Sequence, residues 1–138
     1  MRQNDIVQAA RSFMGTPFVH QGRIPGRALD CAGLVIVVAR TLNIEHFDVD
    51  GYGRNPHQGL LEATIDRNNC LFSVALNEIS PGDILLMRFA REPQHLAIYA
   101  GETLIHSYEA VGKVCEHGID ATWRSRIVKA YRFDGVVA

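Results

Sequence analysis

The chain has 138 residues, of which 47% are hydrophobic and 21% charged, and its formal net charge at pH 7 is −1. This length gives room for about one hydrophobic core, and this apolar content buries enough surface to offset the entropy lost on folding. The near-neutral charge argues against a nucleic-acid-binding domain and against a polybasic membrane patch. We therefore expect a single globular domain over residues 1–138, without a nucleic-acid partner.

Targeting signals and metal motifs are not evident. The first residues lack the apolar core of a secretory signal peptide, and the most apolar run, Ala32–Ala39, is too short to span a bilayer. The three cysteines are widely spaced and include no C-x-x-C pair, so the sequence indicates neither a disulfide framework nor a zinc site. We expect synthesis in the cytoplasm, no membrane span, no metal and no cofactor.

The first predicted element is a helix over residues 4–14, whose apolar residues recur on one face. Asn4 or Asp5 is the expected N-cap, and Gly15 is expected to end the helix because glycine readily adopts a left-handed conformation. Residues 16–29 follow with two prolines and two glycines, which predicts turns. This stretch is expected to connect the first helix to a second one.

The second predicted helix runs from Cys31 to about Leu42 and is apolar on nearly all sides. Asp30 stands where its N-cap belongs. A helix without a polar face is normally buried, so its N-terminus is expected to lie at a special place in the fold. Residues 43–70 have only a weak pattern, which predicts a short helix at 60–67.

From residue 79 onward the pattern changes to that of strands. A turn at 80–83 precedes an apolar run, and Gly101-Glu102 makes a tight connection that predicts a hairpin. Helices followed by strands indicate an α+β fold, in which N-terminal helices pack on a C-terminal antiparallel sheet. The predicted strands are residues 84–89, 95–100, 103–107 and 128–133.

Cys31 is the first candidate for chemistry because it is expected at the N-terminus of the second helix, directly after Asp30. The positive end of the helix dipole and the unpaired N–H groups there favour a thiolate. Sites of this kind lower a cysteine pKa from about 8.5 to about 3.5–7.5. The alternative is a small buried residue without reactivity, and the position alone does not decide between the two.

A histidine close to the Cys31 thiol would favour the reactive interpretation of this residue over the structural one. His95 opens one predicted strand and His106 lies near the end of the next, and the short turn between these strands places the two residues nearly opposite each other. His106 can then bond one ring nitrogen of His95 while the other nitrogen faces the thiol. Cys31, a base and an orienting group form the minimal set for nucleophilic acyl transfer. The histidines interpreted as surface residues are His46, His57 and His117.

Five short segments carry a further signal. They are Gly15-Thr-Pro-Phe18 with His20-Gln-Gly22, Leu29-Asp-Cys-Ala-Gly-Leu34, Pro81-Gly-Asp-Ile84, His95-Leu-Ala-Ile-Tyr-Ala-Gly101 and Leu104-Ile-His106. In this order they resemble the motifs of the NlpC family of papain-like cell-wall cysteine peptidases, most closely the versions encoded by phages. The resemblance covers most of the chain, with residues 43–75 the least distinctive, and it implies a papain-like (NlpC-type) fold.

The resemblance also implies a role for each candidate residue. Cys31 would be the nucleophile that attacks an amide carbonyl, His95 the base and acid, and His106 the residue that orients His95. The backbone N–H of Cys31 would help to bind the oxyanion. The implied substrates are partly D-configured stem peptides of peptidoglycan, often cut after γ-D-glutamate, and no metal is needed.

Two departures from the family pattern bear on substrate binding. Phe18 stands where the family usually has tyrosine, which removes a hydroxyl, and His20 or Gln21 is a candidate replacement donor. Ala32 stands where the family has a serine that frames the substrate pocket. Asp30 is either a helix cap alone or a carboxylate that also meets a substrate amine. The expected substrate-binding residues are therefore Phe18, His20, Asp30 and Ala32.

Other interpretations fit the same sequence. An amidase or acyltransferase could use the Cys31–His95 pair on another amide or ester, and a phage tail or peptidoglycan-binding protein could retain a decayed site. A phage-borne enzyme would have tail proteins as partners, whereas a cytoplasmic enzyme that recycles wall fragments would look identical. Trp123 is interpreted as a packing anchor rather than a sugar platform, and Cys70 and Cys115 as structural thiols.

Overall fold

The computed structural model describes residues 2–44, 65, 70–89 and 92–136. Its helices are α1 (Gln3–Ser12), α2 (Cys31–Thr41) and α4 (Ala121–Ser125), with a 3-10 turn η1 (Leu76–Glu78). Its strands are β1 (Arg23–Ile24), β2 (Ala28–Leu29), β3 (Leu71–Val74), β4 (Ile84–Phe89), β5 (Glu92–Tyr99), β6 (Thr103–Tyr108), β7 (Lys113–Gly118) and β8 (Ile127–Phe133).

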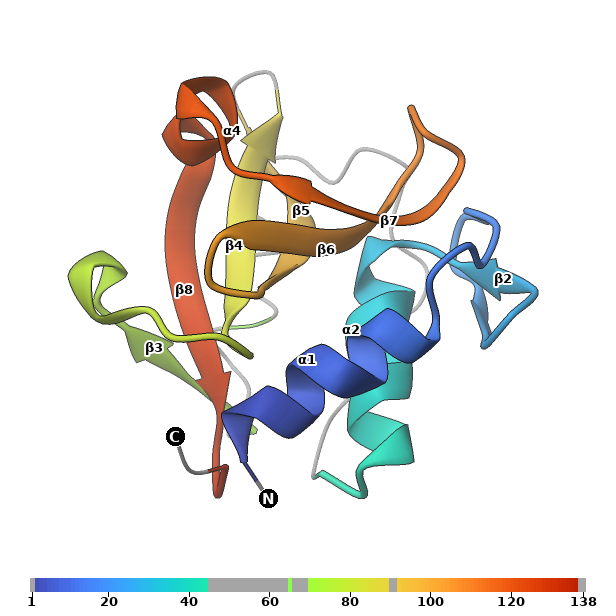
Figure 1. Cartoon of the computed structure of the whole chain (residues 1–138), viewed down its shortest axis with the longest axis horizontal. Helices are drawn as coiled ribbons and strands as arrows, with labels where there is room; N and C mark the ends of the chain where they lie inside the picture. Colours follow the sequence, from blue (N-terminus) through green and yellow to red (C-terminus); the bar gives the residue numbers. More distant parts are fainter. Residues whose placement is uncertain (1, 45–64, 66–69, 90–91, 137–138) are drawn as a thin grey trace.

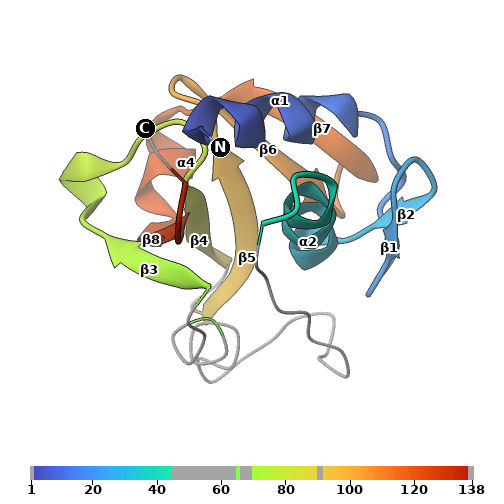
Figure 2. The same ribbon diagram turned by 90° about the horizontal axis from the view of Figure 1, so that it is seen from below.

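The strands β3 to β8 form one antiparallel sheet in the order β3-β8-β4-β5-β6-β7, and β1 and β2 form a separate ribbon. Helix α1 crosses α2 (Figure 1), and α2 runs beside β5 with the β1–β2 ribbon on its outer side (Figure 2). The predicted α+β fold is therefore confirmed, with the helix that begins at Cys31 packed on an antiparallel sheet.

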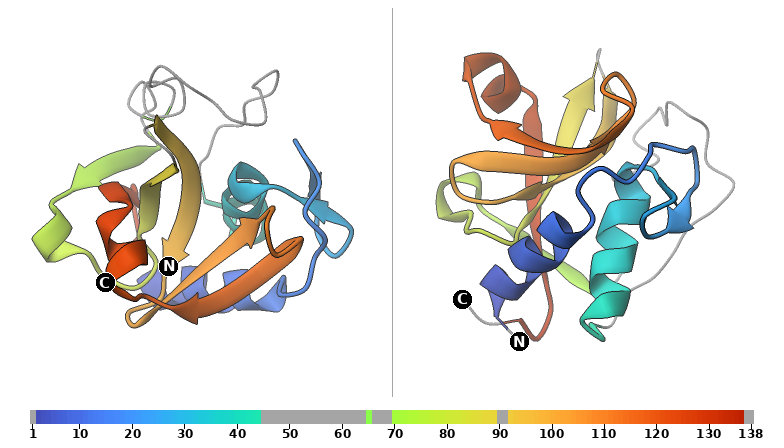
Figure 3. Two further views of the ribbon diagram at one scale, coloured as in Figure 1. Left: turned by 90° about the horizontal axis from the view of Figure 1, so that it is seen from above. Right: turned by 45° about the vertical axis from the view of Figure 1, so that its right-hand side comes forward.

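The sheet changes direction between β5 and β6. There, Ile98 pairs with Ile105 and Tyr99 with Leu104, and no further pairs join the two described strands. Beyond these pairs β6 and β7 run across β4 and β8 instead of alongside them (Figure 3). The start of α2 lies near this separation, because Ser107 of β6 donates a hydrogen bond to the carbonyl just before the helix cap.

Two hydrophobic clusters lie on the two faces of the sheet. Alternate residues of β4 supply both, with Leu86 facing the cluster under α1 and α2 and Leu85 facing the other. Nearly all of the apolar run in α2 is buried in the first cluster, which explains why this helix has no polar face. Trp123 of α4 packs against the second cluster, in agreement with its interpretation as a packing anchor.

The ends of the first helix differ slightly from the prediction. Arg2 is the N-cap, and Asp5 lies in the first turn, where its carboxylate accepts the backbone N–H of Arg2 at 2.9 Å. The expectation that Asn4 or Asp5 caps the helix is therefore wrong. The helix ends at Ser12 with Phe13 as its C-cap, two residues earlier than predicted, and Gly15, whose φ of +84° is left-handed, lies in the turn that follows.

The later elements are only partly predicted by the sequence. The four predicted strands correspond to β4, β5, β6 and β8 with small shifts at their ends. The sequence does not predict β3, β7 or α4, whose short stretches show no clear alternation or helical periodicity. The helix expected at 60–67 lies outside the described residues, apart from Ile65. Among the residues that the structure describes, no helix is long and apolar enough to cross a membrane.

A buried network, which we call the Asp83 clamp, joins α1, the turn before β4, and β8. The carboxylate of Asp83 accepts hydrogen bonds from Gln3 Nε2 at 2.6 Å and from the Ser80 N–H at 2.8 Å. Arg132 adds two donors, Nε at 2.8 Å and Nη2 at 2.9 Å. At Gly82, a Cβ would overlap the carbonyl oxygen of Gln3. The Pro-Gly-Asp turn is therefore a structural joint between the helical layer and the sheet.

Candidate active site

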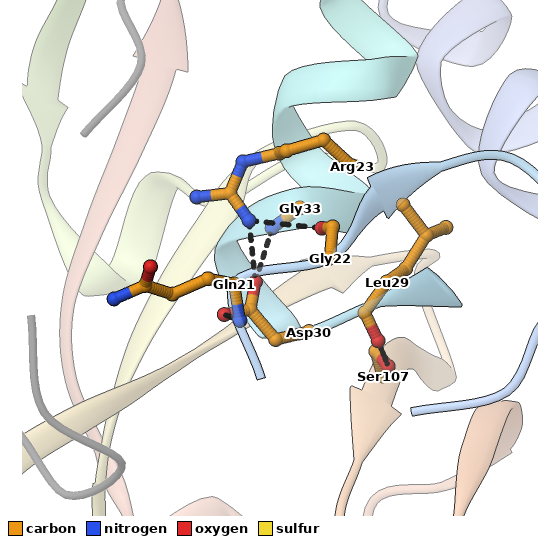
Figure 4. Close-up of polar contacts among 7 residues, drawn as sticks. All are labelled: Gln21, Gly22, Arg23, Leu29, Asp30, Gly33 and Ser107. Atoms are coloured by element: carbon orange, nitrogen blue, oxygen red, sulfur yellow. Dashed lines mark hydrogen bonds and ion pairs between the residues drawn. The ribbon is translucent and has the colours of Figure 1, made fainter. Parts of the chain in front are cut away.

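The start of α2 is held by the carboxylate of Asp30, its N-cap (Figure 4). One oxygen accepts the backbone N–H of Gly33 at 2.7 Å and the guanidinium of Arg23 at 2.9 Å. The other accepts the backbone N–H of Gln21 at 2.8 Å. A buried carboxylate with several donors is the strong form of a helix cap, so the position of the next residue, Cys31, is tightly defined.

Close backbone packing fixes the same helix end from the other side. A Cβ on Gly33 would overlap the carbonyl oxygen of Gly22, so only glycine fits at this place in the first turn. Ser107 donates to the carbonyl of Leu29 at 2.6 Å and thereby ties β6 to the residue that precedes the cap (Figure 4). The hydroxyl of Ser107 therefore positions the strand of His106 relative to the start of α2, where Cys31 lies.

The thiol of Cys31 is partly exposed and interacts with the backbone N–H groups of Leu96 on β5 and of Ala32. Burial, with the Asp30 carboxylate as a second cause, raises the pKa of Cys31 to about 12 against the opposing effect of those N–H groups. The sequence predicts a lowered pKa from the helix dipole. That prediction is wrong, because desolvation of the thiolate outweighs the favourable dipole.

His95 and His106 are both buried, and 2.6 Å separates Nε2 of His95 from Nδ1 of His106. The structure thus brings together the two histidines that the sequence singles out. Their side chains meet beyond the last paired residues of the hairpin, where β5 and β6 have already separated. Burial is the main cause that lowers the pKa of His95 well below its ordinary value and the pKa of His106 to about 3.

These pKa shifts describe a pair of neutral groups rather than an ion pair. Burial raises the pKa of Cys31 and lowers the pKa of His95, so both changes oppose a thiolate beside an imidazolium. A neutral imidazole is a proton acceptor, and a neutral thiol becomes a nucleophile when its proton is removed. The arrangement therefore suits general-base catalysis, in which the proton leaves the sulfur as the new bond forms.

His117 is part of this network, and its interpretation as an ordinary surface residue is corrected by the structure. Its Nε2 lies 2.8 Å from Nε2 of His106, and its Nδ1 lies 2.8 Å from the carbonyl oxygen of Gly118. We call His95, His106 and His117 the histidine line. Each member follows the previous one by eleven residues on successive antiparallel strands, and that regular spacing is the signal in the sequence.

Three aromatic side chains, the aromatic wall, surround the histidine line. Phe89 stacks on His95 with ring centroids 4.7 Å apart, and Tyr108 stacks on His106 at 5.1 Å. Trp123 lies 5.3 Å from His106 and 4.7 Å from His117. These rings exclude water from His95 and His106 and so account for much of the burial that lowers the pKa values of these two residues.

The family of the chain follows from a comparison of its whole sequence. A model of the NlpC/P60 family matches residues 15–132, a span that includes Cys31 and the complete histidine line. The chain belongs to this family. No protein among the curated sequences matches it significantly.

Solved structures of NlpC/P60 proteins share the fold. An NlpC/P60 family protein from Bacillus cereus has 20% identity and a TM-score of 0.71 over 96% of this chain, which covers 40% of that protein. The NlpC/p60 domain of the peptidoglycan hydrolase SagA has 21% identity and a TM-score of 0.65, with 94% and 97% covered. The peptidoglycan hydrolase RipB from Mycobacterium tuberculosis has 18% identity and a TM-score of 0.63, with 94% and 63% covered.

The other predicted site residues of this NlpC/P60 chain occupy different settings. Asp30 is 2% exposed and bound to its three donors, so its role as a cap is confirmed, while contact with a substrate amine stays a prediction. Ala32 is 7% exposed within the larger hydrophobic cluster. Phe18 and His20 are half-buried in the segment before the cap, where the N–H of Phe18 donates to the carbonyl of Gly112. Substrate contacts of Ala32, Phe18 and His20 also stay predictions.

Within residues 2–44, 65, 70–89 and 92–136, no group of three or more His, Cys, Asp or Glu side chains is arranged to hold a metal ion. Four of the six ring nitrogens of the histidine line lie in contacts between its members, His95 Nε2, both nitrogens of His106 and His117 Nε2. None of the three cysteines, Cys31, Cys70 and Cys115, forms a disulfide in the structure.

Proposed function

We propose that the chain is a cysteine peptidase that hydrolyses amide bonds in the stem peptides of peptidoglycan. The observation that carries the proposal is the position of the Cys31 thiol, at the capped start of α2 and against the backbone N–H that follows His95. The bond from His95 to His106 completes a nucleophile, a base and an orienting group. Membership of the NlpC/P60 family, and the printed names of SagA and RipB as peptidoglycan hydrolases, support this substrate class.

The reaction follows from the neutral resting pair. His95 accepts the thiol proton as the sulfur of Cys31 attacks the amide carbonyl, and it then gives that proton to the departing amine. The resulting thioester is hydrolysed by a water molecule that His95 activates in the same way. His106 holds the ring of His95 throughout.

The oxyanion formed in each step needs hydrogen-bond donors. The backbone N–H of Cys31 lies in the first turn of α2, where no intrahelical acceptor is available to it. It therefore serves as a donor to the developing negative charge, aided by the positive end of the helix dipole. Loss of one such donor typically costs about 10²–10³ in rate.

Cleavage of a purified substrate tests the proposal. We expect the protein to release new amine ends from muropeptides and Cys31→Ala to reduce that release to background. The matched control is Cys70→Ala, which removes a thiol near the β3 and β8 ends, where the Cys70 carbonyl bonds Asp134. Cleavage by Cys31→Ala at the wild-type rate, or no cleavage by any variant including the wild type, would contradict the proposal.

Product masses separate this proposal from the other acyl-transfer reactions. A peptidase acting near γ-D-glutamate leaves the sugar and the first amino acids together, whereas an amidase frees the intact stem peptide from the sugar. Alkylation of Cys31 is a weaker test, because burial raises the pKa of this thiol to about 12. Slow alkylation at neutral pH therefore does not indicate a decayed site.

The cellular setting is a second part of the proposal. Its support is the resemblance of the sequence motifs to phage-encoded members of the family. In this proposal the enzyme is carried in a phage or phage-like tail and has tail proteins as partners. Immunoblotting of purified particles tests this part, and we expect the protein to be found in them. Its presence only in the soluble fraction of cells would instead support a role in recycling wall fragments.

A further inference from the structure

We propose that His117 is a positioning residue of this site. Together with the carbonyl of Gly118, it sets which nitrogens of His106 and His95 carry protons, so that the unprotonated nitrogen of His95 faces Cys31. The catalytic meaning of this arrangement rests on the proposed function. The proton positions themselves are measurable without any substrate, so the two proposals can fail separately.

The group at the far end of the histidine line, the carbonyl of Gly118, can only accept a hydrogen bond. The carbonyl oxygen of Gly118 lies 2.8 Å from Nδ1 of His117, and a carbonyl oxygen has no proton to give. Nδ1 of His117 must therefore carry the proton. When His117 is neutral only one of its nitrogens is protonated, so its Nε2 is then an acceptor.

The same rule, that a neutral imidazole has one donor and one acceptor nitrogen, applies to His106 and then to His95. Nε2 of His117 accepts across 2.8 Å, so Nε2 of His106 is the donor. His106 is neutral because burial lowers its pKa to about 3, which leaves its Nδ1 unprotonated. Nδ1 of His106 then accepts across 2.6 Å from Nε2 of His95. His95 is neutral for the same reason, so its Nδ1 has a free electron pair.

That free electron pair is on the side of the thiol. Nε2 of His95 is used by His106, and Nδ1 is the ring nitrogen nearer the main chain. The sulfur of Cys31 interacts with the N–H of Leu96, which is the next main-chain group. The chain of donors therefore ends with a base aimed at the nucleophile.

Because the residue that orients His95 is itself a histidine, His106, it needs a hydrogen-bond partner of its own to fix its proton. A carboxylate at this place would accept from His95 in every case, whereas a neutral imidazole either donates or accepts. If Nδ1 of His106 were protonated, it would donate to His95 and move the proton of His95 to Nδ1, where it would block the thiol. His117 excludes this reversed arrangement, and Trp123 packs against the rings of both His106 and His117.

The first test measures proton positions by ¹⁵N NMR of the imidazoles. In the wild type we expect Nε2 of His95 and Nε2 of His106 to be protonated and both Nδ1 atoms unprotonated. His117→Gln should keep this pattern, because its amide can donate to Gly118 and accept from His106. His117→Lys offers only donors and should reverse it. A protonated Nδ1 on His95 in the wild type, or the same pattern in the Gln and Lys variants, overturns the proposal.

The second test compares rates on a stem peptide. We expect His117→Gln to retain kcat, His117→Leu to lower kcat about five- to tenfold through the loss of one hydrogen bond, and His117→Lys to lower it about a hundredfold or more, with KM unchanged. Val111→Lys adds the same charge at an exposed position of the β6–β7 turn and should leave kcat unchanged. Equal losses in the Gln and Leu variants that follow their melting temperatures would indicate a merely structural role and overturn the proposal.

Discussion

The Asp83 clamp and the histidine line are both buried polar networks that connect separate elements, but they are built from opposite kinds of groups. The clamp joins a carboxylate to a guanidinium, an amide and a backbone N–H, so every group has a fixed role as donor or acceptor. The line consists of neutral imidazoles, each of which can exchange those roles. The clamp can therefore only hold its position, whereas the line can move a proton.

The two networks also differ in how burial affects them. Asp83 is fully buried, yet Arg132 stays charged beside it, and the hydrogen bond to Asp83 is the main cause that raises the pKa of Arg132. Among the residues that the structure describes, no carboxylate is bonded to the three imidazoles of the line, and desolvation lowers the pKa values of His95 and His106. We therefore expect the free energy of unfolding to depend on Asp83 and Arg132 being charged in the clamp and on His95 and His106 being neutral in the line.

The largest expected effect is the loss of stability in acid through His106. The unfolded chain binds a proton at this residue below about pH 6.5, whereas the folded chain binds it only near pH 3, because burial lowers the pKa of His106 to about 3. The folded state therefore loses about 1.4 kcal/mol per pH unit between these limits, about 5 kcal/mol in all. Urea denaturation from pH 7 to pH 4 measures this slope.

His106→Gln is the comparison for that slope, since it keeps a polar group and removes the titration. We expect its stability at pH 7 to be lower than that of the wild type and the difference between the two proteins to shrink as the pH falls. A constant difference across the range would show that His106 is protonated in the folded chain.

The second largest expected effect is the stability that is lost when the Asp83–Arg132 ion pair of the clamp is broken. Asp83→Asn keeps the shape of the side chain but leaves the Arg132 guanidinium, which is 21% exposed, without its counter-charge. Breaking a buried ion pair from one side typically costs 3–5 kcal/mol, and partial hydration of Arg132 places our expectation at about 3 kcal/mol. Urea denaturation at pH 7 measures it, while kcat per folded molecule should stay unchanged. A cost below about 1 kcal/mol would mean that the clamp is not a stabilising joint.

The smallest effect concerns a charge that lies beside the line. The Arg126 guanidinium lies 4.6 Å from the ring centre of Trp123 and 5.2 Å from that of Phe89, and its charge contributes to lowering the pKa of His95 after burial and His106. Arg126→Gln should therefore raise the pKa of His95, as followed by NMR titration. Arg124→Gln is the matched control, since Arg124 is exposed on the same α4 helix. An equal shift in both variants would assign the effect to general charge rather than to position.

Much of the site can be predicted from the sequence, because it depends on helix caps and turns that involve only neighbouring residues. Asp30 before an apolar run predicts a capped helix, and the cap is present with Cys31 as the first helical residue. The Gly101-Glu102 turn predicts the hairpin that brings His95 and His106 together, and they are bonded. Each of these features is encoded within a few residues or across a single tight turn, so a periodicity or a turn signal is enough to find it.

The role of His117 and the raised pKa of Cys31 cannot be predicted from such local patterns. The role of His117 depends on β7, a short strand whose pairing to β6 places His117 beside His106 and under Trp123. The raised pKa of Cys31 depends on how much protein surrounds the thiol, against which a helix dipole is the smaller effect. The sequence by itself determined which side chains could do chemistry. Only the tertiary structure decided their protonation, because desolvation and proton sharing depend on groups that are distant along the chain.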